Sequence, residues 1–144
     1  MNFNSLHIQV MSLARQLLAS EQITCYHHSE EKLILCEADN TITEFNIAVA
    51  KKPALHWVLS ASSKFKAPFS CRVVQMCSNK AGTFIRTEFG EVYCKGIDIF
   101  KHGVLGLGDN FIVSQLTRIP IPDPVKSFAV SSKHGVALSG EIMR

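Results

Sequence analysis

The sequence predicts an all-β fold, a partial β-propeller of about three 50-residue repeats, with a short N-terminal helix. The first observation is a turn residue followed by a polar and then a β-branched residue, in Asn40-Thr41-Ile42, Gly90-Glu91-Val92 and Gly140-Glu141-Ile142. The spacing is constant, because 90 − 40 and 140 − 90 are both 50. Periods of 20–50 residues are typical of solenoids and propellers, in which one repeat cannot bury its apolar face alone.

The second observation is that strand-like segments flank each of these turns. We expect hairpins at roughly 33–45, 83–94 and 136–143, because apolar and β-branched residues alternate around Asn or Gly. A short apolar strand should precede the second and third hairpins, at Val73–Cys77 and Val125–Ala129. Each repeat therefore contains an inner strand, a polar connection and a hairpin.

The remaining segments are less regular. Residues 5–22 have apolar residues at helical spacing and predict the N-terminal helix, although their first residues also alternate as a strand would. Within 48–68, we expect loops around Lys51–Pro53 and Lys64–Pro68, with a possible strand at Leu55–Leu59 between them. Pro120, Pro122 and Pro124 exclude a central strand and mark a connection between blades.

Length and composition indicate one globular domain. The chain has 144 residues and 47% hydrophobic residues, so we treat 1–144 as one repeat domain with repeats near 1–50, 51–100 and 101–144. A net charge of +3 is too small to indicate nucleic-acid binding. The N-terminus shows no signal-peptide pattern, and the sequence contains no apolar run of membrane-spanning length. We therefore expect a cytoplasmic or nuclear protein without membrane contact.

Charge is unevenly distributed along the chain. Residues 1–50 hold two basic and six acidic residues, a net charge of −4, whereas residues 51–101 hold nine basic and three acidic, a net charge of +6. Such a basic region could attract an acidic partner. Ordinary solvated strand faces and loops explain the same charges and are the simpler interpretation. The candidate interaction surface comprises Lys51, Lys52, Lys64, Lys66, Lys95 and Lys101.

The residues that could perform chemistry do not form a recognisable catalytic set. The glycines of Gly103–Gly108 are in the wrong order for a dinucleotide fingerprint, and no Lys-Ser or Lys-Thr pair follows them. Cys94 beside Lys95 could be an activated thiol, but no orienting acid accompanies its nearest candidate base, His102. We therefore expect no enzymatic activity and no cofactor.

Metal binding is also disfavoured. The five cysteines are widely spread and odd in number, which argues against a disulfide framework and a zinc ribbon. His27 and His28, near Cys25 and Glu30, are the candidate ligands, but adjacent residues of a strand point to opposite faces. A surface or turn role for the two histidines is the better interpretation.

The stretch from Val73 to Met143 resembles the repeat of the regulator of chromosome condensation family. The matching segments are Phe89–Gly96, then His102–Asp109, then Lys133–Ile142, and together they cover about one and a half repeats. The resemblance implies a propeller of seven four-stranded blades. Three repeats are fewer than half of such a ring, so we expect a fragment or completion of the blades by another chain.

The resemblance also implies structural roles for particular residues. His134 and Gly135 would begin a hairpin strand, with the histidine partly buried and bonded to neighbouring backbone. Lys95 replaces the usual tryptophan, Val104 the usual glutamine, and Ala81 stands where the next repeat has His134. The expected repeat glycines are Gly90 and Gly140 at turns, and Gly96, Gly103, Gly106 and Gly108 where the chain passes close to neighbouring strands.

Two functions are compatible with this resemblance. The first is a non-catalytic protein-interaction module whose partner is a protein, acidic or a small GTPase. The alternative is a guanine-nucleotide exchange factor for a small GTPase of the Ran type, which is the activity of the family's founding member. No residue of this chain matches the exchange wedge, so we favour the interaction module.

Overall fold

The structure is a computed structural model in which the described residues are 12, 16, 22–29, 31–52, 54, 56–99, 101, 103–108, 110–131 and 134–139. The chain divides into two compact units, Met1–Ser70 and Cys71–Arg144, each described by itself below. Ser12 and Gln16 are helical, as expected for 5–22. Apart from Gln22, the rest of that segment lies outside the described residues.

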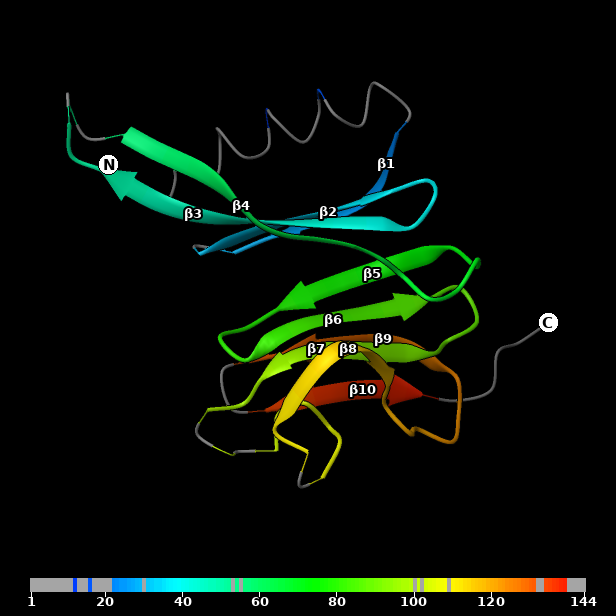
Figure 1. The fold of residues 1–144 in the computed structure, drawn as a ribbon. Coiled ribbons are helices and arrows are strands. Elements are labelled where there is room, and N and C mark those ends of the chain that lie inside the picture. Colours follow the sequence, from blue (N-terminus) through cyan, green and yellow to red (C-terminus); the bar gives the residue numbers. More distant parts are fainter. Residues whose placement is uncertain are drawn as a thin grey trace. The chain divides into compact units, whose positions relative to one another are not determined.

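The first unit contains a four-stranded antiparallel sheet with the strand order β1-β2-β3-β4 (Figure 1). The central position of β2 explains its composition, because Leu33–Cys36 is a continuous apolar run and all four residues are buried. The strands are β1 Ile23–His28, β2 Lys32–Glu37, β3 Thr41–Ala50 and β4 His56–Lys66.

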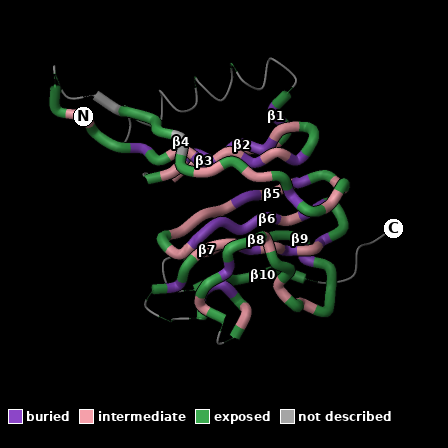
Figure 2. Tube along the Cα trace, viewed as in Figure 1, coloured by how far each residue is buried: buried purple, intermediate pink, exposed green. Residues whose placement is uncertain are grey.

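The second unit contains a four-stranded antiparallel sheet, order β5-β6-β7-β8, and a two-stranded sheet of β9 and β10. Its core joins the two sheets, because Phe84 and Cys94 of the first sheet cluster with Val125 and Phe128 of β9. Figure 2 shows buried residues concentrated in the central strand β6 of this unit. The strands are β5 Val73–Ser78, β6 Gly82–Thr87, β7 Val92–Ile97, β8 Ile112–Arg118, β9 Val125–Val130 and β10 Gly135–Ser139.

Three equivalent turns connect the first two strands of each repeat. They span 29–32, 79–82 and 131–134, and in each the first N–H donates to the fourth carbonyl, at 2.8, 3.0 and 2.7 Å. The side chain of the first turn residue also accepts a hydrogen bond from the N–H of the fourth residue. The acceptors are Ser29 Oγ (3.2 Å), Asn79 Oδ1 (2.9 Å) and Ser131 Oγ (3.1 Å). The repeat predicted from the sequence is therefore present as one local structure formed three times.

A second pair of equivalent turns explains the 50-residue spacing of Asn40 and Gly90. Both residues end a turn in which their N–H donates three residues back, to Glu37 O at 2.9 Å and Thr87 O at 3.0 Å. Both have positive φ, 65° and 82°, a conformation that glycine and asparagine adopt at low cost. The predicted turn role of Gly90 is confirmed, whereas Gly140 lies outside the described residues.

The hairpins predicted at 33–45 and 83–94 are confirmed by the pairs β2–β3 and β6–β7. The inner strands at Val73–Cys77 and Val125–Ala129 are confirmed as β5 and β9, and 119–124 contains no strand. In the third hairpin, the described part is β10, which pairs back onto β9.

The structure differs from the sequence predictions at one loop and adds two strands. Lys64–Lys66 is not a loop, because β4 continues through it and pairs Lys66 with Thr41. Strands β1 and β8 were not predicted. β1 is rich in polar side chains, and β8 buries only Val113, so neither has a regular apolar pattern. Counted from their inner strands, the repeats begin at Ile23, Val73 and Val125.

His134 differs from its expected environment. Its side chain is exposed, and its hydrogen bonds to Ser131 are made by its main chain. As the fourth residue of its turn, it corresponds to Gly82 and not to Ala81. Gly135 opens β10 as expected.

Candidate interaction surface

An apolar cleft of about 220 Å³ lies in the second unit, between the β5–β8 sheet and the β9–β10 pair. Its walls come from β6, β7, β9 and β10, from the segment after β8 and from the glycine-rich segment 103–106. The apolar side chains of the lining include Phe84, Ile119, Ile121, Phe128, Val130 and Val136.

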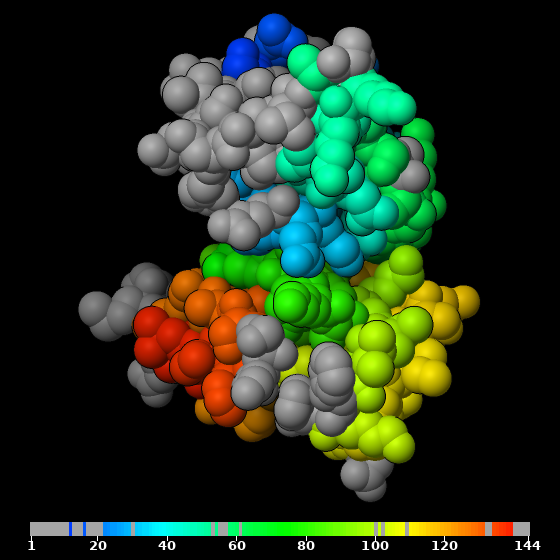
Figure 3. Space-filling model, turned by 90° about the vertical axis from the view of Figure 1, so that its left-hand side faces the viewer, coloured from blue at the N-terminus to red at the C-terminus, as the bar shows by residue number. Residues whose placement is uncertain are grey.

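Strand β10 forms one wall of this cleft and leaves its large side chains at the surface. Val136 is 70% exposed and Leu138 is 64% exposed. Counted from the equivalent turns, Val136 corresponds to Ile34 and Phe84, whose side chains are 0% and 2% exposed. The same strand position is thus core in two repeats and surface in the third. Figure 3 shows β9 and β10, in orange and red, at the surface of the second unit.

The outer edge of β10 is also open among the described strands, because its sheet contains only β9 and β10. The side chain of Gln75 fixes the direction of the backbone groups: its Nε2 donates to Phe128 O (2.7 Å) and its Oε1 accepts from Phe128 N–H (3.3 Å). The N–H and C=O of Phe128 therefore point toward Gln75 and not toward β10. Because Phe128 stands opposite Ala137, these two residues exchange no main-chain hydrogen bonds. The N–H and C=O of Ala137 therefore point away from β9, toward the open edge.

The edges of β4 and β10 differ in charge. β4, the last strand of its sheet, carries Lys64 and Lys66, both exposed, and lysines on an edge discourage pairing with another chain. β10, Gly135–Ser139, has no charged residue. It consequently lacks the protection that β4 has.

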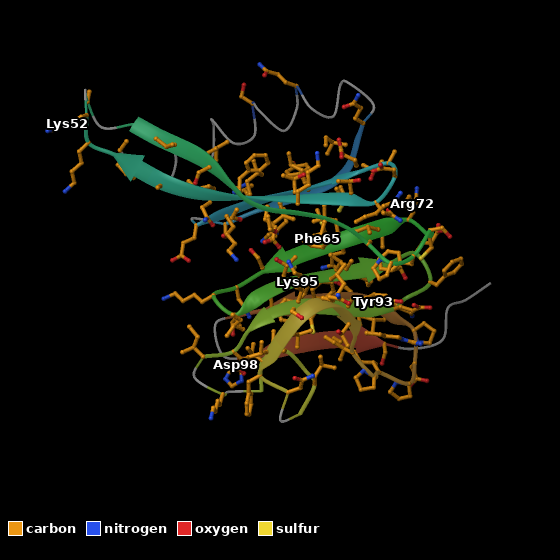
Figure 4. All side chains as sticks on the ribbon, viewed as in Figure 1. Lys52, Phe65, Arg72, Tyr93, Lys95 and Asp98 are labelled. Atoms are coloured by element: carbon orange, nitrogen blue, oxygen red, sulfur yellow. The ribbon has the colours of Figure 1, made fainter. Side chains whose placement is uncertain are left out.

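The four candidate lysines of the first unit lie at two ends of one pair of strands. Within the first unit, Lys66 pairs with Thr41 at one end of the β3–β4 ladder, while Lys51 and Lys52 follow its other end at Ala50. At about 3.3 Å per residue, those ends are roughly 30 Å apart. Figure 4 shows Lys52 and Phe65, the neighbour of Lys64, at opposite ends of this hairpin.

The other two candidate lysines lie in the second unit. Lys95 is half-buried on β7, and Lys101 places its Nζ 5.6 Å from the centre of the Phe111 ring.

A buried carboxylate organises the glycine-rich segment. Asp98 is buried, and its Oδ2 accepts hydrogen bonds from the N–H groups of Gly103 (2.8 Å) and Val104 (3.3 Å). This side chain follows β7 directly and is labelled in Figure 4. It acts as a structural cap for the segment, a role that composition alone did not reveal.

The repeat glycines have different reasons for their presence. A Cβ on Gly96 would collide with the backbone of Ala81, and one on Gly82 with the backbone of Lys95, so the expected close approach is confirmed at Gly96. At Gly106 a Cβ would come within 3.1 Å of Ile119 Cγ2. Gly103 and Gly108 have open space around them, so close packing is the wrong explanation there; their φ angles of 76° and 63° are the constraint.

Cys94 is placed as a structural residue. Its Sγ donates to Leu105 O at 3.2 Å, and burial raises the pKa of the thiol to about 11. A thiol with this pKa remains protonated near neutral pH, so it is a poor nucleophile.

His27 and His28 end β1 and lie on opposite faces of the sheet, as neighbouring strand residues do. Burial, with a further contribution from His28, lowers the pKa of His27. Among the described residues, no group of three or more His, Cys, Asp or Glu side chains is arranged to hold a metal ion. The described residues also include no helix long and apolar enough to cross a membrane.

Comparisons with known proteins identify the fold. No family model matches the chain, and no curated protein matches it. Among solved structures, the crystal structure of human WBSCR16, a propeller-like protein of the regulator of chromosome condensation type, matches with a TM-score of 0.58 and 14% sequence identity. The match covers 83% of this chain and 31% of that chain, so this chain spans about a third of the matched structure. The fold is therefore all-β, a partial propeller.

Proposed function

We propose that the chain is a non-catalytic protein-interaction module of the regulator of chromosome condensation repeat type. The observation that carries this proposal is the surface of β10, where Val136 and Leu138 are exposed beside an apolar cleft. Ile34 and Phe84, the residues equivalent to Val136 in the other two repeats, are covered by protein, so a protein surface is the natural cover for Val136. The partner is accordingly a protein.

A site-specific cross-linking experiment tests this proposal. A photoreactive phenylalanine analogue replaces Leu138 in the full chain, and the same analogue replaces Phe89 as a control. Both native side chains are exposed, and Phe89 belongs to the turn between β6 and β7 and not to β10. We expect a discrete protein adduct from position 138 and none from position 89. Equal labelling at both positions, or none at 138, would contradict the proposal.

A second measurement separates binding from nucleotide exchange. Release of labelled GDP is followed from Ran and from a panel of small GTPases, with the chain at micromolar concentration. We expect no acceleration, because the residues that match the family are those of the repeat and not of the exchange wedge. A tenfold or greater acceleration would replace the interaction module with the exchange factor.

A further inference from the structure

We propose that Cys25 and Cys36 form a reversible disulfide between β1 and β2, so that oxidation by a peroxide links the edge strand β1 covalently to its sheet. This modification is independent of the proposed function. The two residues stand directly opposite each other in the β1–β2 ladder, and both are thiols in the structure. Cysteines at facing positions of paired strands can be joined without a large backbone movement.

The spacing of the two strands suits this bond. Disulfides join residues whose Cα atoms are about 4.4–6.8 Å apart, and directly opposite residues of antiparallel strands have Cα atoms about 4.5–5.5 Å apart. The two side chains share one face of the sheet, because directly opposite residues point the same way. The ladder is regular from this pair to His28 opposite Leu33, and its irregularity lies before Cys25.

The cysteines of the second unit do not have this arrangement. Cys77 of β5 and Cys94 of β7 both stand opposite Phe84, so the whole of β6 lies between them. Two strand spacings are roughly 9.5 Å, which is beyond the reach of a disulfide. Cys77 and Cys94 therefore serve as an internal control for the bond between β1 and β2.

The two thiols of the first unit differ in their access to solvent, and this difference sets the order of the reaction. Cys25 is half-buried, so a small oxidant can reach it, whereas Cys36 is 0% exposed and donates a 3.5 Å hydrogen bond to Glu37 O. The Cys25 thiolate attacks one oxygen of the peroxide, the O–O bond breaks, and the released hydroxide takes up a proton to form water. Cys25 is then a sulfenic acid.

Cys36 completes the reaction. Its sulfur attacks the sulfur of Cys25, the S–S bond forms, the S–O bond breaks, and the hydroxyl group leaves with the proton of Cys36 as water. In total the two thiols lose two electrons, and the peroxide is reduced to two water molecules. Burial, and then the neighbouring Cys25, raise the pKa of the Cys36 thiol to about 11. Few Cys36 thiols are ionised near neutral pH, and the fixed proximity of the two sulfurs compensates for this.

The edge position of β1 gives the bond its consequence. Among the described strands, β1 pairs only with β2, and Ile23 is its only buried residue. A strand with one neighbour and few buried side chains opens locally more easily than a central strand. A bond to the central strand β2 would hold β1 on the sheet under oxidising conditions, and a dithiol reductant would release it.

Peptide mapping of the full chain tests the bond. The reduced protein is treated with hydrogen peroxide, alkylated without reduction and digested with trypsin, which cleaves after Lys32 between the two cysteines. We expect the peptides of Cys25 and Cys36 to be joined, with the loss of two hydrogen atoms, and dithiothreitol to separate them. Peroxide that oxidises Cys25 without joining it to Cys36, or that joins Cys77 to Cys94 equally well, would overturn the proposal.

Hydrogen exchange of the β1 amides tests the consequence. Oxidation should slow this exchange by about tenfold or more, because the bond suppresses local opening of β1. Cys25→Ser should abolish the effect, whereas Cys77→Ser, the matched change of another half-buried strand cysteine, should retain it. Cys36→Ala should instead accumulate a Cys25 sulfenic acid that dimedone traps. Equal exchange of β1 in the reduced and oxidised forms of the unmodified chain would overturn the proposal.

Discussion

Replacing Gln75 with alanine should loosen β9 from the first sheet of the second unit. The change removes the 2.7 Å bond to Phe128 O and the 3.3 Å bond from Phe128 N–H, and it also removes the 2.9 Å bond that Oε1 accepts from Arg86 Nε. Each neutral bond contributes about 1 kcal/mol net. The Arg86 guanidinium is only half-buried and can bind water instead. We therefore expect a loss of about 2 kcal/mol.

Amide hydrogen exchange measures this loss where it occurs. A destabilisation of about 2 kcal/mol corresponds to an exchange rate at the Phe128 amide about 30-fold faster, if the amide exchanges through opening of β9. Gln115→Ala on β8 is the matched control, because Gln115 is exposed and its substitution should change stability by less than about 0.5 kcal/mol. Equal exchange rates at Phe128 in the two variants would refute the bridging role of Gln75.

Four further predictions follow from contacts described above. Gly82→Ala should lower the free energy of unfolding in urea by roughly 3 kcal/mol, because the added Cβ would meet the Lys95 backbone. Gly103→Ala, where the Cβ enters open space, should lower it by roughly 1 kcal/mol. Similar losses in the two variants would contradict the packing argument. Asp98→Ala should expose 99–108 to limited proteolysis and Asp98→Asn should do so less, since the amide keeps an acceptor for Gly103 and Val104; equal cleavage would argue against the cap. Cys36 and Cys94 should resist iodoacetamide at pH 8 in the native protein, because burial raises the pKa of each thiol to about 11 and leaves roughly one thiolate in a thousand; peptide mapping that finds either modified as fast as a free cysteine would refute this. His134→Ala should change stability by less than about 0.5 kcal/mol because the side chain is exposed, and a large fall in melting temperature would restore the role expected from the family resemblance.

The sequence was informative where local chemistry determines the structure. The hairpins around Asn40 and Gly90 were predictable because a positive φ restricts the residue type and apolar strands flank each turn. The strands that were missed lie at sheet edges, where β1 and β8 bury few side chains and so show no apolar periodicity.

Long-range contacts explain most of what the sequence did not reveal about the site. The partners Gln75 and Phe128 are 53 residues apart, and no local pattern indicates that they meet. The exposure of Val136 was also not predictable from the sequence. An apolar residue in a strand is expected to be buried when the strand is assumed to have a neighbour. The sequence shows that this region is rich in lysines. How far apart they lie along β3 and β4 depends on the register in which the two strands pair.

The three side-chain-capped turns have a consequence for the order of folding. Each joins two strands across only two intervening residues, so its closure costs little chain entropy, and hairpins of this kind form within about 1–10 μs. The Gln75–Phe128 bridge closes a far longer loop and must wait until both of its strands exist. In the second unit, we therefore expect the β5–β6 and β9–β10 hairpins to form first, and β9 to dock against β5 later. Mutations in the turns should slow folding, whereas loss of the bridge should mainly speed unfolding.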